Sequence, residues 1–146
     1  MEKNKTPQFI RLYNNVLPPH LCFNIIHTYE KLWREQEEDI KKMSLCYNES
    51  GVKTCGACDC QRLDIMQHHE FKPYFNEVIY RFQHLVSQYK NDVVADDCQL
   101  PENYRYENFR VKRYLCDKNQ QHDTHVDVTN ADNAKRFLAF VCYLND

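Results

Sequence analysis

The sequence predicts an α+β domain in which two amphipathic helices come first and strands follow. Two apolar stripes recur at helical spacing before residue 91, and the apolar period changes to two residues after residue 103. Helices followed by strands along one chain are typical of the α+β class. The 146 residues, of which 42% are hydrophobic, suit one domain with a real core. We expect residues 1–100 to form a helical support region and residues 101–146 to supply the strands.

The first helix is expected to begin at a pair of prolines. Residues 9–17 are predicted to form a strand, which Pro18 and Pro19 end, because proline is tolerated in the first turn of a helix but interrupts a strand. The helix is expected to end near Lys42 in a charged stretch. Its apolar stripe consists of Leu21, Ile25, Tyr29, Leu32 and Trp33.

The second helix is expected from Pro73 to Lys90, after a loop. Residues 44–66 have no clear period, so we predict a loop there with a short strand at Arg62 to Met66. Both helices are amphipathic, so each should pack one face against a sheet. The stripe of the second helix consists of Phe75, Val78, Ile79, Phe82, Leu85, Val86 and Tyr89.

Two strands are expected in the last third of the chain. Residues 104–116 alternate with a period of two, and residues 136–144 form an apolar run typical of a buried strand. In the first strand, one predicted face carries Phe109, Val111 and Leu115, and the other carries Tyr106, Lys112 and Tyr114.

Composition excludes several classes of function. Two glycines cannot build a phosphate-binding loop, and a net charge of −2 without a basic run gives nucleic-acid binding no support. The longest apolar run, Phe137 to Leu144, is far shorter than the roughly 20 residues of a membrane helix. Residues 1–5 lack the apolar core of a signal peptide. We therefore expect a soluble cytoplasmic protein with reduced cysteines and no membrane or nucleic-acid partner.

The most informative motif is His125-Val126-Asp127. Residues i and i+2 of a strand point to the same side, so this imidazole and this carboxylate can reach one cation. Two histidines and one carboxylate on one face of iron(II) leave positions open for a co-substrate and O₂. We predict that His125 and Asp127 are metal ligands whose side chains converge.

The neighbouring sequence resembles the prolyl 4-hydroxylase-like dioxygenases, which depend on iron(II) and 2-oxoglutarate. The matching segments are Val111 to Tyr114, His125 to Asp127 and Arg136 to Asp146, which ends in a Tyr-Leu-Asn signature. The resemblance extends more weakly back to Phe9. It implies a partial double-stranded β-helix, a jelly-roll relative, supported by the two N-terminal helices.

The resemblance also implies roles for single residues. His125 and Asp127 correspond to the first two iron ligands, Tyr143 to a tyrosine that binds the 2-oxoglutarate carboxylate, and Tyr114 to a pocket-lining tyrosine. Tyr143 shares a strand face with Val141, Ala139 and Phe137, so its phenol is expected in an apolar cavity, although plain core packing is the alternative for both tyrosines. The implied reaction is hydroxylation of an aliphatic C–H bond, either at prolyl residues of a protein or in a small molecule, with ascorbate as the reductant.

The sequence departs from the family at its end. The family's later strands carry the distal histidine and the basic residue that pairs with 2-oxoglutarate, and neither can be assigned here, because no histidine follows Asp127 and the only later basic residues are Lys135 and Arg136. Arg136 is expected to tie down a loop. We therefore expect a truncated chain with little dioxygenase activity, whose terminal strand has an unpaired edge and promotes self-association.

Two other hypotheses compete. Cys55, Cys58 and Cys60 have zinc-like spacing, so a small zinc-binding interaction module is an alternative, although a reduced loop is favoured because no second regular pair exists. The second competing hypothesis is a catalytically inactive jelly-roll fragment. The His68-His69-Glu70 stretch is interpreted as a polar helix entry, and His122 as a solvent-facing or supporting residue.

Overall fold

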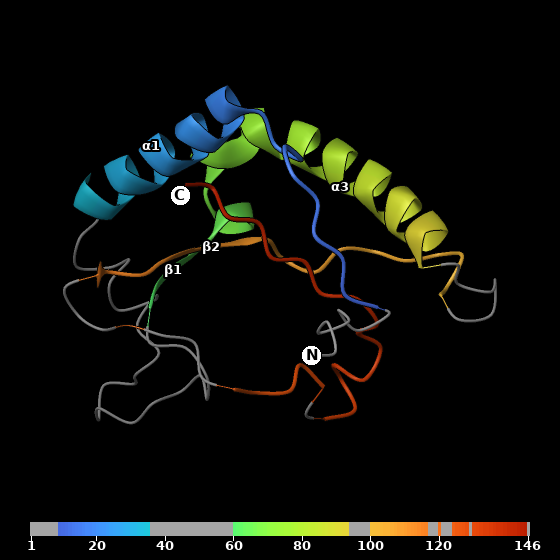
Figure 1. Ribbon diagram of the computed structural model, residues 1–146. Helices are drawn as coiled ribbons and strands as arrows, with labels where there is room; N and C mark the ends of the chain where they lie inside the picture. The colour runs from blue at the N-terminus through green and yellow to red at the C-terminus, as the bar shows by residue number, and fades with distance from the viewer. Residues whose placement is uncertain are drawn as a thin grey trace, which may run out of the picture.

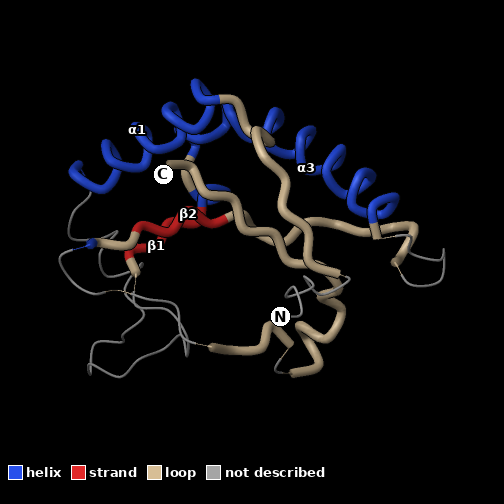
Figure 2. Tube along the Cα trace, in the orientation of Figure 1, coloured by secondary structure: helices blue, strands red, loops and turns tan. Residues whose placement is uncertain are grey.

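The computed structural model describes residues 9–35, 60–93, 100–116, 120, 124–128 and 130–145. In these ranges two long helices lie on one side of a layer formed by a two-stranded ribbon and by extended segments (Figure 1, Figure 2). This is the α+β arrangement that the sequence predicts, without a closed jelly roll in the described part of the chain. None of the described helices combines the length and the apolar character needed to cross a membrane.

Helix α1, Pro19–Glu35, begins at the predicted proline pair. The Pro18 carbonyl accepts hydrogen bonds from the amides of Leu21, at 2.9 Å, and Cys22, at 3.2 Å, which closes the first turn. The predicted end near Lys42 lies outside the described residues. The predicted stripe is confirmed, because all of its members are buried: Leu21, Ile25, Tyr29, Leu32 and Trp33.

Helix α3, Lys72–Asp92, matches the second predicted helix within two residues at each end. Two short 3₁₀ turns precede it, η1 at Ile65–Gln67 and η2 at His69–Phe71, so the His68 to Glu70 stretch enters a helix as predicted. The predicted apolar stripe again faces the core. Val78, Phe82, Val86 and Tyr89 are buried, and Phe75, Ile79 and Leu85 are half-buried.

The ribbon consists of β1, Gln61–Asp64, and β2, Arg110–Arg113, paired antiparallel. Leu63 lies opposite Val111, and both pack toward the helices. Because side chains alternate along a strand, the pairs Arg62–Lys112 and Asp64–Arg110 point to the other side. This side of the ribbon, carrying Arg62, Asp64, Arg110 and Lys112, is called the far face below.

The strand predicted at residues 104–116 is much shorter than expected. Of residues 104–116 only the four of β2 form a ladder, because β1 offers only four partners. Residues 104–109 therefore do not follow strand alternation. Tyr106, expected on the side away from Phe109, instead packs beside it against the core, with ring centroids 5.7 Å apart.

The core lies between the ribbon and the helices. Phe71, which is 1% exposed, sits where α3 begins, and Phe82 of α3 contacts both Phe109 and Phe140 at centroid distances of 5.5 Å and 5.4 Å. Aromatic side chains bury large areas and dominate core energetics. Phe82 thus joins α3 to the segment before β2 and to the C-terminal segment.

Residues 136–145 form no ladder, so the prediction of a buried strand at 136–144 is wrong for the described chain. Burial of the side chains nevertheless alternates along this segment, as it does along an extended chain. Leu138, Phe140, Cys142 and Leu144 are half-buried, the last three against the core, and Phe137, Ala139, Val141 and Tyr143 are exposed. The predicted sharing of one face by the second set is confirmed, but that face is the exposed one.

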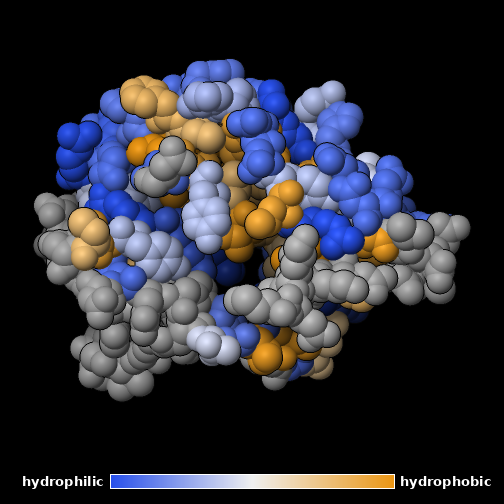
Figure 3. Space-filling model, viewed as in Figure 1, coloured by the Kyte–Doolittle hydropathy of each residue, from blue (hydrophilic) through white to orange (hydrophobic). Residues whose placement is uncertain are grey.

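Residues 9–17 are also not a strand, contrary to the prediction. Asn15 has a φ of 58°, a left-handed conformation that interrupts an extended chain. Side chains of α3 hold the segment instead: the Tyr89 hydroxyl donates to the Phe9 carbonyl at 2.7 Å, and Arg81 donates to the Val16 carbonyl at 3.4 Å. In Figure 3 orange side chains reach the surface near the middle of the visible face. Exposed hydrophobic residues of the two extended segments include Phe9, Ile10, Leu12, Phe137 and Val141.

Candidate functional site

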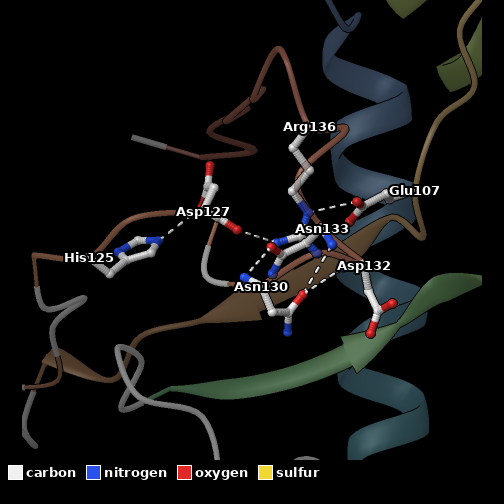
Figure 4. A network of polar contacts seen from close by, with 7 residues as sticks. All are labelled: Glu107, His125, Asp127, Asn130, Asp132, Asn133 and Arg136. Carbon is white, nitrogen blue, oxygen red and sulfur yellow. Dashed lines mark hydrogen bonds and ion pairs between the residues drawn. The ribbon is translucent and has the colours of Figure 1, made fainter.

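The predicted metal ligands lie together on an exposed stretch that follows β2. His125 Nε2 is 3.2 Å from Asp127 Oδ1, and the two side chains are 41% and 50% exposed (Figure 4). Residues 124–128 are neither helix nor strand, so no neighbouring strand supports the pair. The i, i+2 spacing still brings both groups to one side. The predicted convergence of the two side chains is therefore confirmed, although the predicted strand is not.

Arg136 holds the backbone of this stretch. Its Nη1 donates to the Asp127 carbonyl at 2.8 Å, and its Nε donates to Glu107 Oε1 at 2.6 Å (Figure 4). The hydrogen bond from Arg136 lowers the pKa of Glu107, and the same contact raises the pKa of the guanidinium. Arg136 therefore ties the Asp127 backbone to the segment before β2, which is the loop-anchoring role that the sequence predicts.

Two asparagines shape the turn between Asp127 and Arg136. Asn130 Oδ1 accepts hydrogen bonds from the amides of Asp132, at 3.1 Å, and Asn133, at 3.2 Å. In return, Asn133 Oδ1 accepts from the Asn130 amide at 3.0 Å (Figure 4). Asparagine side chains stabilise turns in this way by replacing backbone acceptors. The turn reverses the chain so that Arg136 can reach back to Asp127.

Lys112 links the far face to the candidate ligands. Burial lowers the pKa of the Lys112 ammonium most, followed by the charges of Arg110 and Arg62, whereas the Asp127 carboxylate raises it. Asp127 is thus close enough to act on Lys112. The sequence places Lys112 on one face with Tyr114 but contains no local signal for this proximity, because it depends on the register of β1 against β2 and on the course of the later turn.

The two tyrosines assigned to 2-oxoglutarate are near one another but are not enclosed. Burial raises the pKa of Tyr114, and the neighbouring Tyr143 raises it further. Tyr143 is 86% exposed and Val141 is 80% exposed, so the apolar cavity expected around the Tyr143 phenol is not present. The reason is that the even-numbered residues of the C-terminal segment, not the odd-numbered ones, face the helices. The roles of Tyr114 and Tyr143 in binding stay predictions.

The donor set at His125 and Asp127 fits part of an iron site. An imidazole nitrogen and a carboxylate oxygen are two donors of the type that a two-histidine, one-carboxylate triad uses. No group of three or more His, Cys, Asp or Glu side chains is arranged around one point in the described ranges. Two candidate ligands can therefore be named, and a third would have to come from elsewhere. His122 lies outside the described residues.

The cysteine cluster differs from the prediction of reduced thiols. Cys60, which is 5% exposed, is disulfide-bonded, and a sulfur in a disulfide is not a thiolate ligand for zinc. Cys55 and Cys58 lie outside the described residues. Free thiols occur at Cys22, Cys116 and Cys142, and burial raises the pKa of the first and the last. The disulfide at Cys60 thus argues against a zinc site that includes this residue.

Comparison with known proteins found no matching family model, no matching curated protein and no matching solved structure.

Proposed function

We propose that this chain is a domain of an iron(II)- and 2-oxoglutarate-dependent dioxygenase of the prolyl-hydroxylase type, and that His125 and Asp127 supply two of the metal ligands. The observation that carries the proposal is the 3.2 Å approach of His125 Nε2 and Asp127 Oδ1 on an exposed stretch. With iron and 2-oxoglutarate bound, such a centre supplies the oxidant for hydroxylation of an aliphatic C–H.

The residues around the pair support a binding role. Arg136 fixes the Asp127 backbone through its carbonyl, so the carboxylate is held without its oxygens being consumed by that contact. Supporting contacts of this kind orient metal ligands and raise metal affinity. His125 Nε2 cannot hold a proton and a metal ion at once, so binding of a cation would replace the present contact with Asp127 by two bonds to the metal.

We also propose that the layer beneath the helices belongs to a double-stranded β-helix. The alternating burial of residues 136–145 supports this, since an extended segment with one face on the core has the side-chain pattern of a strand. The far face of the ribbon and the exposed odd-numbered residues of the C-terminal segment would then line the interior of the jelly roll. A protein substrate or a small molecule would approach from that side.

A metal titration tests the proposal. Purified protein should bind Mn²⁺ or anaerobic Fe²⁺ with one site by calorimetry, and His125→Ala or Asp127→Asn should abolish that site. The chain provides a matched control in His69 and Glu70, whose Nδ1 and Oε2 are 3.5 Å apart. His69→Ala should leave metal binding unchanged. Equal loss in the control, or retention of binding in both site variants, would refute the assignment.

Succinate formation from 2-oxoglutarate tests the enzymatic part. We expect at most slow turnover by residues 1–146 with iron(II) and ascorbate, because only two protein ligands can be named. Metal binding without turnover would indicate an inactive binding domain. Robust turnover that disappears in Asp127→Ala would mean that another residue, or a second copy of the chain, completes the site.

A further inference from the structure

Residues 9–14 form a strap that is held against the end of α3 by polar side chains. No backbone–backbone hydrogen bond joins this strap to another residue that the structure describes. Its apolar side chains contribute little burial, because Phe9, Ile10 and Leu12 are all exposed. The strap therefore depends on its side-chain contacts and not on the hydrophobic core.

Three contacts hold the strap, and all of them involve the last turn of α3. The Tyr13 hydroxyl donates to Asp92 Oδ2 at 2.8 Å, and Arg11 Nη2 donates to the Asp92 carbonyl at 3.0 Å. The third is the hydrogen bond from the Tyr89 hydroxyl to the Phe9 carbonyl. A carboxylate in the last turn of a helix lies at the negative end of the helix dipole, so Asp92 does not stabilise α3. Its carboxylate serves instead to hold Tyr13.

Asn15 separates the strap from the residues that are anchored in the core. Its φ of 58° marks a left-handed turn in the backbone. Immediately after this turn, Val16 packs against the core, Leu17 is buried, and Arg81 donates to the Val16 carbonyl. The strap can therefore leave α3 by rotation at Asn15 while the core stays packed.

We propose that Tyr13 is a phosphorylation site for a tyrosine kinase, and that a phosphate on its hydroxyl releases the strap from α3. In the reaction, Tyr13 Oη forms a bond to the γ-phosphorus of ATP, the bond from that phosphorus to ADP breaks, and the phenolic proton passes to the kinase's catalytic carboxylate. The Tyr13–Asp92 contact is exposed to solvent. A segment held by so few contacts opens locally at small cost, which gives a kinase access to it.

Phosphorylation would turn the attraction between the strap and α3 into repulsion. Burial and the contact with Asp92 raise the pKa of Tyr13 to about 12, so its hydroxyl is protonated and donates near pH 7. A phosphate in its place carries nearly two negative charges beside the Asp92 carboxylate and the C-terminal end of α3, both of which repel it. Arg11 is the cation that acts on Tyr13, but it belongs to the strap. Pairing with the phosphate would withdraw Arg11 from the Asp92 carbonyl and remove a second contact.

The test uses the full chain and does not depend on the His125–Asp127 pair. The protein is treated with a purified tyrosine kinase domain, Mg²⁺ and ATP, and the modified tyrosines are assigned by mass spectrometry. Chymotrypsin cleavage after Phe9 then measures release of the strap, with the rate divided by that of a synthetic peptide carrying the same phosphate. Phosphate on Tyr13 should accelerate this cleavage about tenfold, the factor expected for loss of one charge-assisted hydrogen bond.

Two variants separate this effect from a general loosening of the protein. In Tyr13→Phe, treatment with the kinase should leave the cleavage rate unchanged, even where exposed tyrosines such as Tyr143 are modified. Asp92→Asn keeps an acceptor for the Tyr13 hydroxyl but lacks the charge, so phosphate should accelerate its cleavage less.

Three outcomes would overturn the proposal: no phosphate on Tyr13, an unchanged cleavage rate in the phosphorylated chain, or an equal acceleration in Tyr13→Phe. Full acceleration in Asp92→Asn would reject repulsion by the Asp92 carboxylate as the cause of release.

Discussion

The guanidinium of Arg113 lies over the indole of Trp33, with 5.2 Å between Cζ and the ring centroid. The ring of Tyr29 lies at 5.3 Å from the same atom, so the cation contacts two aromatic side chains of α1. Arg113 also pairs with Glu30 and donates from Nε to Gln61 Oε1 at 2.6 Å. One side chain of β2 therefore connects the ribbon to α1 on the helix side.

Replacing Arg113 should destabilise the fold. Arg113→Met should lower the free energy of unfolding by about 2 kcal/mol, because it removes two cation–π contacts and leaves Glu30 half-buried without its partner. Urea denaturation followed by tryptophan fluorescence measures the change. Arg105→Met, at an exposed position just before β2, should stay within about 0.5 kcal/mol of the parent. Similar losses in both variants would show that the stacked arrangement contributes nothing specific.

Phe82 should be among the most sensitive core positions. Phe82→Ala removes a ring that contacts Phe109 and Phe140, and a buried Phe→Ala change costs about 3–5 kcal/mol. Thermal or urea unfolding checks the loss. Tyr80→Ala on the same helix is the control, because Tyr80 is 59% exposed, and it should change stability by less than about 1 kcal/mol.

The Tyr106 hydroxyl should be dispensable. Burial raises the pKa of Tyr106 to about 12, and the neighbouring Tyr104 contributes to the shift. The oxygen is buried, yet no described residue forms a hydrogen bond with it. Tyr106→Phe should therefore stabilise the protein by about 1 kcal/mol, since a buried polar group without a partner is costly. A loss of stability on this change would reveal a partner for the hydroxyl.

The Glu107–Arg136 contact should respond to pH. Because the Arg136 hydrogen bond lowers the pKa of Glu107, its contribution is present above the ordinary glutamate pKa and is lost as pH falls through the lowered value. NMR titration of the Glu107 side chain should show this lowered pKa. Arg136→Gln should return it toward the ordinary value of about 4.3. Lys135→Gln, which removes the same charge one residue earlier, should leave most of the shift in place.

The helices could be predicted from the sequence because their signal is local. Each stripe recurs every three or four residues, and a helix needs no partner to bring those residues to one side. A strand, by contrast, forms only where a neighbouring segment pairs with it, and the sequence does not name that segment. Residues 9–17 have apolar residues at strand spacing, but the backbone turns at Asn15 and the chain is held by α3.

The candidate site shows the same division. Convergence of His125 and Asp127 follows from their spacing along the chain, and Arg136 could be recognised as an anchor from its place after a polar turn. The position of Lys112 opposite Arg62 could not be predicted from the sequence, since it depends on which residue of β1 pairs with which residue of β2. The prediction that Tyr143 is enclosed was wrong, because an alternation of period two defines two faces of a segment but does not say which face meets the core.

The C-terminal segment separates two properties that usually go together in a strand. Phe140 packs its ring on Phe82, yet the amides of residues 137–145 donate no backbone hydrogen bond to other described residues. Amide hydrogen exchange should therefore be fast along this segment and slow in the middle of α3, although both contribute side chains to one core. A molecule that pairs with this segment would slow its exchange at alternate amides and leave the packing of Phe140 unchanged, which makes residues 137–145 a built-in reporter of strand addition.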